Sequence, residues 1–151
     1  MTFERYEKRK EAIALWYNRY IETTYTKLSR FGHLAEYHLN KTDAFLMKRC
    51  ADIRKNTSSF VGNPEDVMAM IRNSLIRNRE EIIEYLANED DKDVWELIDL
   101  LDEKVGGKII TTSSQHDWSK GALSCTEYKI TLKKDPTSAN HFVITSAYPF
   151  L

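Results

Sequence analysis

The side chains best suited to proton transfer near neutral pH are the four histidines, His33, His38, His116 and His141. His38 precedes Arg49 by 11 residues, which is close to three turns of helix. A histidine and a guanidinium that meet on one phosphate would supply general acid–base catalysis and charge stabilisation. An unbroken helix would hold the two about 16 Å apart, so the hypothesis requires the chain to bend near Asn40–Lys41.

A second group of polar side chains lies at the end of the chain, just before Pro149. On a strand, alternate residues share a face, which divides this run into Ile144, Ser146 and Tyr148 on one side and Val143, Thr145 and Ala147 on the other. A hydroxyl and a phenol are therefore predicted to be aligned. The alternative is an ordinary strand with one half-polar face.

Metal and cofactor sites are not indicated by any spacing in the sequence. His33 and His38 are five residues apart, whereas zinc ligands on one helix face are four apart. Cys50 and Cys125 lack a CxxC pattern, and either free thiols or a disulfide would fit them. We expect neither a metal nor another cofactor.

The net charge of −1 conceals a division along the chain. Residues 1–60 hold 12 basic against 7 acidic residues, 61–105 hold 5 against 13, and 106–151 hold 5 against 3. The basic first third suits a polyanionic ligand or a solvated helix face. The acidic middle would repel nucleic acid and is expected to face elsewhere, toward a basic partner.

Helical periodicity dominates the first half of the chain. Apolar residues recur at helical spacing from Phe3 to about Arg30, and Gly32 separates this segment from a second one that begins near His33. Asn40 or Thr42 is expected to cap the helix that carries Leu46 and Cys50. Composition predicts a loop at residues 56–59. A further helix is predicted from Asn63–Pro64 to about Ala87.

The second half changes in character after Val105. Residues 94–101 form a short apolar segment that is compatible with helix or strand. Two alternating runs, 127–132 and 140–148, are joined through an Asp135–Pro136 turn, which is typical of an antiparallel hairpin. Helices followed by strands predict an α+β fold, with N-terminal helices packed on a C-terminal antiparallel β-sheet. A chain of 151 residues suffices for one core, and we expect no stable membrane insertion and no secretion leader.

These segments, taken in order, resemble the RNase A-like toxin domains at the C-termini of bacterial contact-dependent growth inhibition (CdiA) proteins and related polymorphic toxins. The resemblance covers roughly residues 32–150. It starts with a Gly-His, a second His with a following Lys-Thr, and a Leu-x-x-Arg, and it continues to a closing Tyr-Pro. The matching residues are Gly32–His33, His38, Lys41–Thr42, Leu46–Arg49, Ser58–Phe60, Asn78–Ile82, Gly106–Gly107, Leu132–Pro136 and Ile144–Pro149.

Two departures from the family pattern are visible. The family's Thr-Ala-Tyr is Ser146-Ala147-Tyr148 in this chain, and a serine can replace threonine as a hydroxyl donor. The segment Ser113–Gly121 has no counterpart in the pattern. Residues 1–31 lie outside the resemblance, and we expect them to form a helical segment that joins the toxin domain of residues 32–151 in one compact unit.

The resemblance implies an RNase A-like fold and a metal-independent endoribonuclease. In such a reaction the RNA 2′-OH attacks the adjacent phosphate and leaves a 2′,3′-cyclic phosphate. The implied catalytic residues are His38 as acid and base, Arg49 as phosphate clamp, and Ser146 and Tyr148 as hydrogen-bond donors. The substrate-binding residues implied beside them are His33, Lys41 and Thr145.

The resemblance also implies partners and a place of action. A cognate immunity protein would neutralise the domain, which is expected to be monomeric. The domain would be delivered from a secreted or cell-surface bacterial protein into the cytoplasm of a target bacterium.

Two other functions remain compatible with the residues. A non-enzymatic helical interaction protein, an immunity protein or adaptor, would use the acidic segment 61–105. A non-catalytic RNA-binding domain would stack bases on its aromatic side chains, although those of residues 1–31 fall at the spacing of a buried helix face.

Overall fold

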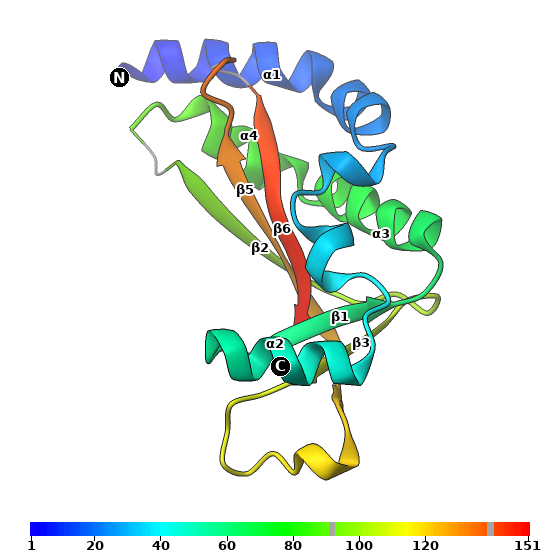
Figure 1. Ribbon diagram of the computed structural model, residues 1–151. Helices are drawn as coiled ribbons and strands as arrows, with labels where there is room; N and C mark the ends of the chain where they lie inside the picture. Colours follow the sequence, from blue (N-terminus) through cyan, green and yellow to red (C-terminus); the bar gives the residue numbers. More distant parts are fainter. Residues whose placement is uncertain (91–92, 139–140) are drawn as a thin grey trace.

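The computed structural model describes residues 1–90, 93–138 and 141–151, and its helices and antiparallel sheets confirm the predicted α+β class (Figure 1). The N-terminal helix lies across one end of the long C-terminal hairpin, and the C-terminus lies at the other end. The α-helices are α1 (Phe3–Thr24), α2 (Asp43–Ile53), α3 (Pro64–Arg77) and α4 (Arg79–Ala87).

Helix α1 packs against α3 and α4 through one apolar face. Ile13, Tyr17 and Ile21 recur at four-residue spacing and are completely buried. The helix ends at Thr24, earlier than the predicted Arg30, and a 3₁₀ turn at Leu28–Arg30 follows.

The chain bends between His38 and α2, as the convergence hypothesis requires. A π-helix spans Leu34–His38, and Asn40 then adopts a left-handed conformation with φ 52°. Thr42 caps α2, because its hydroxyl accepts a hydrogen bond from the Phe45 N–H at 3.1 Å. Of the two expected caps, Thr42 is therefore the correct one.

The helix predicted from Pro64 to Ala87 is two helices, with a break at Asn78. Its predicted start is confirmed, since the Asn63 side chain accepts from the Glu65 N–H. At the break, the Asn78 backbone N–H and side-chain amide both donate to the Ser74 carbonyl. Asparagine side chains bond locally to the backbone in this way, which favours a helix end at this position.

The strands form two three-stranded antiparallel sheets, with orders β1-β3-β4 and β2-β5-β6. The predicted hairpin is confirmed as β5 and β6, while Asn140, the predicted start of its second run, lies outside the described residues. The segment left open between helix and strand is strand β2. The strands are β1 (Thr57–Val61), β2 (Val94–Leu100), β3 (Gly106–Ile110), β4 (Leu123–Ser124), β5 (Glu127–Lys134) and β6 (Phe142–Phe150).

The predicted loop at residues 56–59 is wrong, because strand β1 starts at Thr57. Its hydroxyl-bearing residues Thr57, Ser58 and Ser59 are buried. The Thr57 hydroxyl donates to the Leu46 carbonyl at 2.7 Å, and the Ser59 hydroxyl to the Phe60 carbonyl at 2.9 Å. Such bonds allow polar side chains inside a core, which composition alone does not indicate.

Strand β6 contains a bulge that changes the predicted alternation. Thr131 of β5 pairs with Ser146, and the next residue of β5 pairs with Ile144, so Thr145 is the extra residue. Ser146 and Tyr148 do share a face, as predicted. Ile144 does not join them, because beyond the bulge it turns into the core with Ala147.

The structure also decides between the two states of the cysteines. Cys50 and Cys125 are both buried free thiols, and burial raises the pKa of Cys125 to about 11. Across the described ranges, no helix has the length and apolar character needed to cross a membrane.

Candidate active site

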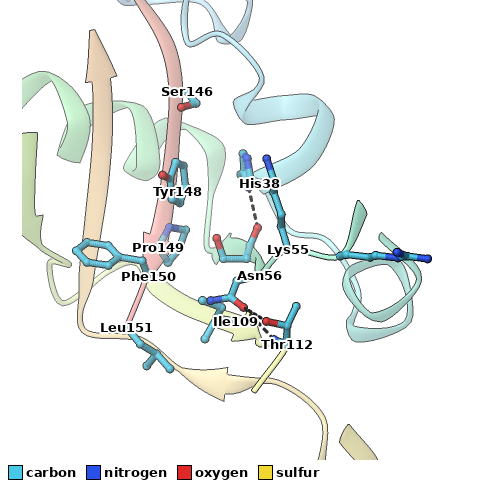
Figure 2. A pocket seen from close by; sticks show the side chains of 12 residues that line it. His38, Lys55, Asn56, Ile109, Thr112, Ser146, Tyr148, Pro149, Phe150 and Leu151 are labelled. Carbon is cyan, nitrogen blue, oxygen red and sulfur yellow. Dashed lines mark hydrogen bonds between the residues drawn. The ribbon is translucent and has the colours of Figure 1, made fainter. Parts of the chain in front are cut away.

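A hollow of about 610 Å³ opens between the end of β6 and the start of β1 (Figure 2). Three predicted catalytic residues from distant segments of the chain line it, namely His38, Ser146 and Tyr148. The remaining lining residues are Arg54, Lys55, Asn56, Ser58, Ile109, Thr112, Pro149, Phe150 and Leu151.

His38 is held at the edge of β1 by backbone and side-chain contacts. The segment after it runs beside β1, where the Asn40 N–H donates to the Phe60 carbonyl at 2.8 Å. His38 Nδ1 lies 2.9 Å from the Ser58 carbonyl oxygen. Because a carbonyl only accepts, Nδ1 carries the proton, and in the neutral ring Nε2 is left with a lone pair.

The protonation state of His38 follows from its surroundings. Burial lowers the pKa of His38 below its ordinary value, and the positive charge of Arg49 lowers it further, against the opposing effect of the Ser58 hydrogen bond. The ring is therefore neutral near pH 7. A neutral imidazole with a free Nε2 can accept a proton, which is what a general base must do.

The Tyr148 ring lies next to the His38 ring in the hollow. Their ring centroids are 5.4 Å apart, at an interplanar angle of 33°. Ser146, two residues earlier on the same face of β6, lines the hollow with them (Figure 2). A proton acceptor, a phenol and a hydroxyl thus surround one space.

The Gly32–His33 segment packs against the bulge in β6. The His33 N–H donates to the Thr145 carbonyl at 3.3 Å. Gly32 has φ +60°, and a Cβ at this position would lie 2.1 Å from the same oxygen, so only glycine fits. The His33 ring points elsewhere: its side chain is 62% exposed, and Nδ1 lies 3.2 Å from a Glu36 carboxylate oxygen.

Arg49 and Lys41 surround His38 without lining the same hollow. The Arg49 guanidinium carbon lies 3.6 Å from the centroid of the Tyr37 ring, a close cation–π stack. Arg49 lines a neighbouring hollow of about 370 Å³ with Tyr37. The Lys41 ammonium lies 5.0 Å from the centroid of the Phe45 ring.

Thr145, a predicted substrate-binding residue, is engaged within the protein. Its hydroxyl donates to the Thr131 carbonyl at 3.2 Å, and its carbonyl accepts from His33. The structure therefore places this residue beneath the site, where it holds the bulge and the Gly32–His33 segment together.

Sequence reasoning missed five polar residues of the hollow, namely Arg54, Lys55, Asn56, Ser58 and Thr112. The sequence contains the adjacent basic pair Arg54–Lys55, but the position of this pair relative to the hollow depends on how α2 ends. Arg54 takes a left-handed conformation with φ 56° and turns the chain from α2 into β1. That turn carries Lys55 and Asn56 to the hollow.

The other two histidines have structural roles. His116 Nδ1 accepts from the Thr111 N–H at 2.9 Å, and Nε2 lies 3.0 Å from the Gly121 carbonyl oxygen. The His141 ring lies against Trp16 and Tyr20 at centroid distances of 4.5 and 4.8 Å. Within the described part of the chain, no three His, Cys, Asp or Glu side chains are grouped to hold a metal ion.

Comparison with known proteins identifies the family. Residues 32–149 match the family model described as the bacterial CdiA-CT RNAse A domain. Among solved structures, the chain is similar to one in a CdiA-CT/CdiI complex from Y. kristensenii 33638, with 25% sequence identity and a TM-score of 0.64 over 80% of this chain and 100% of that chain. No curated protein matches the sequence.

Proposed function

Because the chain belongs to the bacterial CdiA-CT RNase A domain family, we propose that it is an endoribonuclease toxin that cleaves RNA without a metal. The RNA 2′-OH attacks its own adjacent phosphate, the P–O2′ bond forms and the P–O5′ bond breaks. The products are a 2′,3′-cyclic phosphate and a free 5′-OH. The observation that supports this most is the His38 ring beside the Tyr148 ring in one hollow, where burial lowers the pKa of His38.

His38 is the proposed acid–base residue. Nε2 accepts the proton of the 2′-OH, while the Ser58 carbonyl holds the protonated Nδ1 in place. A proton must then reach the leaving 5′-oxygen. The Tyr148 hydroxyl is the second group of the hollow that can transfer one, and Ser146 donates a hydrogen bond to the phosphate.

Positive charge at the phosphate comes from the basic residues around His38. Arg49 is the proposed clamp, since a guanidinium binds two phosphate oxygens at once, and its stack on Tyr37 restricts the plane of its fork. Lys55 lines the hollow itself. His33 and Lys41 are assigned to substrate positioning at the rim, and Thr145 to support of the Gly32–His33 segment.

An immunity protein is the proposed partner. The solved relative is a complex of a CdiA-CT with a CdiI, which supports a cognate immunity protein for this chain, one that covers the active site. The domain is proposed to act as a monomer in the cytoplasm of a target bacterium after delivery from a larger protein.

The alternative of a non-enzymatic interaction protein has less support. Part of the acidic charge in 61–105 is already paired with basic residues from other segments. Glu89 pairs with Arg5 at 2.6 Å and Glu96 with Lys129 at 3.5 Å. The family match likewise favours the toxin.

The deciding experiment incubates total bacterial RNA with the purified protein in EDTA, beside the H38A variant. We expect the wild type to degrade the RNA and H38A to leave it intact. DNA incubated in parallel should not be cleaved by either protein, because the nucleophile is the 2′-OH. Intact RNA with both proteins would overturn the proposal. Cleavage of the DNA would overturn the mechanism.

A further inference from the structure

A second hollow of about 640 Å³ adjoins the proposed catalytic one. Asn56 and Thr112 line both, so they stand where the two meet. The second hollow is also lined by Ser113, Gln115 and His116, from the segment that has no counterpart in the family pattern. A substrate bound at His38 therefore has room to continue past Asn56.

The side-chain amide of Asn56 is oriented by Thr112. Its Oδ1 accepts from the Thr112 N–H at 2.9 Å and from the Thr112 hydroxyl at 3.4 Å. These bonds fix which end of the amide is oxygen. The Nδ2 end points away from Thr112 (Figure 2), and Asn56 is exposed, so its two N–H donors are available to a ligand.

Thr112 offers the complementary group. Since its hydroxyl proton is directed at Asn56 Oδ1, the lone pairs of Oγ1 remain as acceptors. The pair thus presents a donor next to an acceptor. The Watson–Crick edges of the four bases carry donors and acceptors in different orders, so a fixed donor–acceptor pair binds them unequally, and unpaired bases of RNA are read on this edge.

The position of the pair suits the base next to the reacting phosphate. Asn56 lies two residues before Ser58, whose carbonyl holds His38, and Asn56 and His38 line the same hollow.

We propose that Asn56, oriented by Thr112, reads the base of the nucleotide whose 2′-OH attacks, and so sets the base preference of the enzyme. This inference rests on the proposed ribonuclease function. The same pair also ties the start of β1 to the end of β3, so the test must separate recognition from a purely structural role.

The test uses four short RNAs that differ only in the base 5′ to a single cleavable phosphate. The N56D variant keeps the size of the side chain and an oxygen for the Thr112 N–H, but it replaces the free donor with an acceptor. We expect the ratios of kcat/KM among the four RNAs to change by roughly tenfold or more. T112V, which keeps the N–H and removes Oγ1, should also change the ratios.

A matched control is N73D, the same amide-to-carboxylate change at an exposed position of α3. It should leave the ratios as in the wild type. Equal cleavage of the four RNAs by the wild type, or wild-type ratios in folded N56D and T112V, would overturn the inference while leaving the ribonuclease intact.

Binding of the same RNAs to H38A, with and without N56D, separates the two proposals. If no protein cleaves RNA but binding depends on the base and N56D changes that dependence, base reading holds and the ribonuclease function fails. If binding is also independent of the base, both fail.

Discussion

The ring of His38 lies 5.4 Å from that of Tyr148, centroid to centroid, although the two come from opposite ends of the domain. Two backbone contacts create this pairing. The Ser58 carbonyl orients the His38 imidazole beside β1. The Thr145 carbonyl, in the bulge of β6, accepts a hydrogen bond from the N–H of His33, five residues before His38. The reactive groups are therefore placed by main-chain oxygens that have no part in the chemistry.

Replacing His38 with alanine should lower kcat/KM on a defined RNA by about 10² to 10⁴, the usual contribution of one acid–base group. Single-turnover cleavage of a labelled oligonucleotide measures it. H33A is the matched control, because that ring is exposed and outside the hollow, and its loss should be much smaller. Activity of H38A equal to the wild type would remove His38 from the mechanism.

Arg49→Lys should also impair cleavage, by roughly tenfold or more, since an ammonium cannot bind two phosphate oxygens as a fork. It would also lose the planar stack on Tyr37. The control K48A removes a charge from the neighbouring residue. If R49K cleaves as fast as the wild type, Arg49 supplies only general positive charge.

The dependence of kcat/KM on pH should reflect the burial of His38. As a base, His38 acts only when neutral, so kcat/KM rises with pH through its pKa. Burial lowers that pKa below 6.5, which places the midpoint of the acidic limb below pH 6.5. NMR titration of the ring in the free protein should give a matching midpoint, and a midpoint above 6.5 would contradict this assignment.

The same shift links His38 to stability. The unfolded chain binds a proton to this residue more readily than the folded chain does. The contribution of His38 to the free energy of unfolding is therefore lost as the pH falls from about 6.5 through the lower folded-state pKa.

Gly32→Ala should destabilise the fold. The new Cβ would lie 2.1 Å from the Thr145 oxygen at a backbone φ of +60°, and the left-handed strain alone costs on the order of 1–3 kcal/mol. Gly106→Ala is the control, because its Cβ would meet its nearest atoms at 3.6 Å. Urea unfolding measures both, and equal midpoints would show that the bulge can move aside.

Local patterns in the sequence predicted much of this site but not its surroundings. The shared face of Ser146 and Tyr148 follows from the alternation of one strand, so the sequence predicts it. The bend after His38 is only a condition of the His38–Arg49 hypothesis, because it depends on the left-handed conformation of Asn40, which spacing does not reveal. The bulge at Thr145 depends on the docking of Gly32 from a distant segment. The place of Asn56 depends on Thr112 and on the buried hydroxyls of β1, which composition assigned to a loop.

Deletion of residues 1–31 should abolish folding, although the family match begins only at residue 32. Ile13, Tyr17 and Ile21 are wholly buried, and the Tyr17 hydroxyl donates to the Leu75 carbonyl at 2.7 Å inside the core. Removing α1 would expose this face of α3 and α4 to water. A milder change is I21A, which should lower the free energy of unfolding by about 2–5 kcal/mol. The control is L15A, at a 90% exposed position of the same helix, which should change the free energy of unfolding little. Circular dichroism and urea unfolding follow both, and a truncated chain that stays folded and cleaves RNA would make residues 1–31 a separable module.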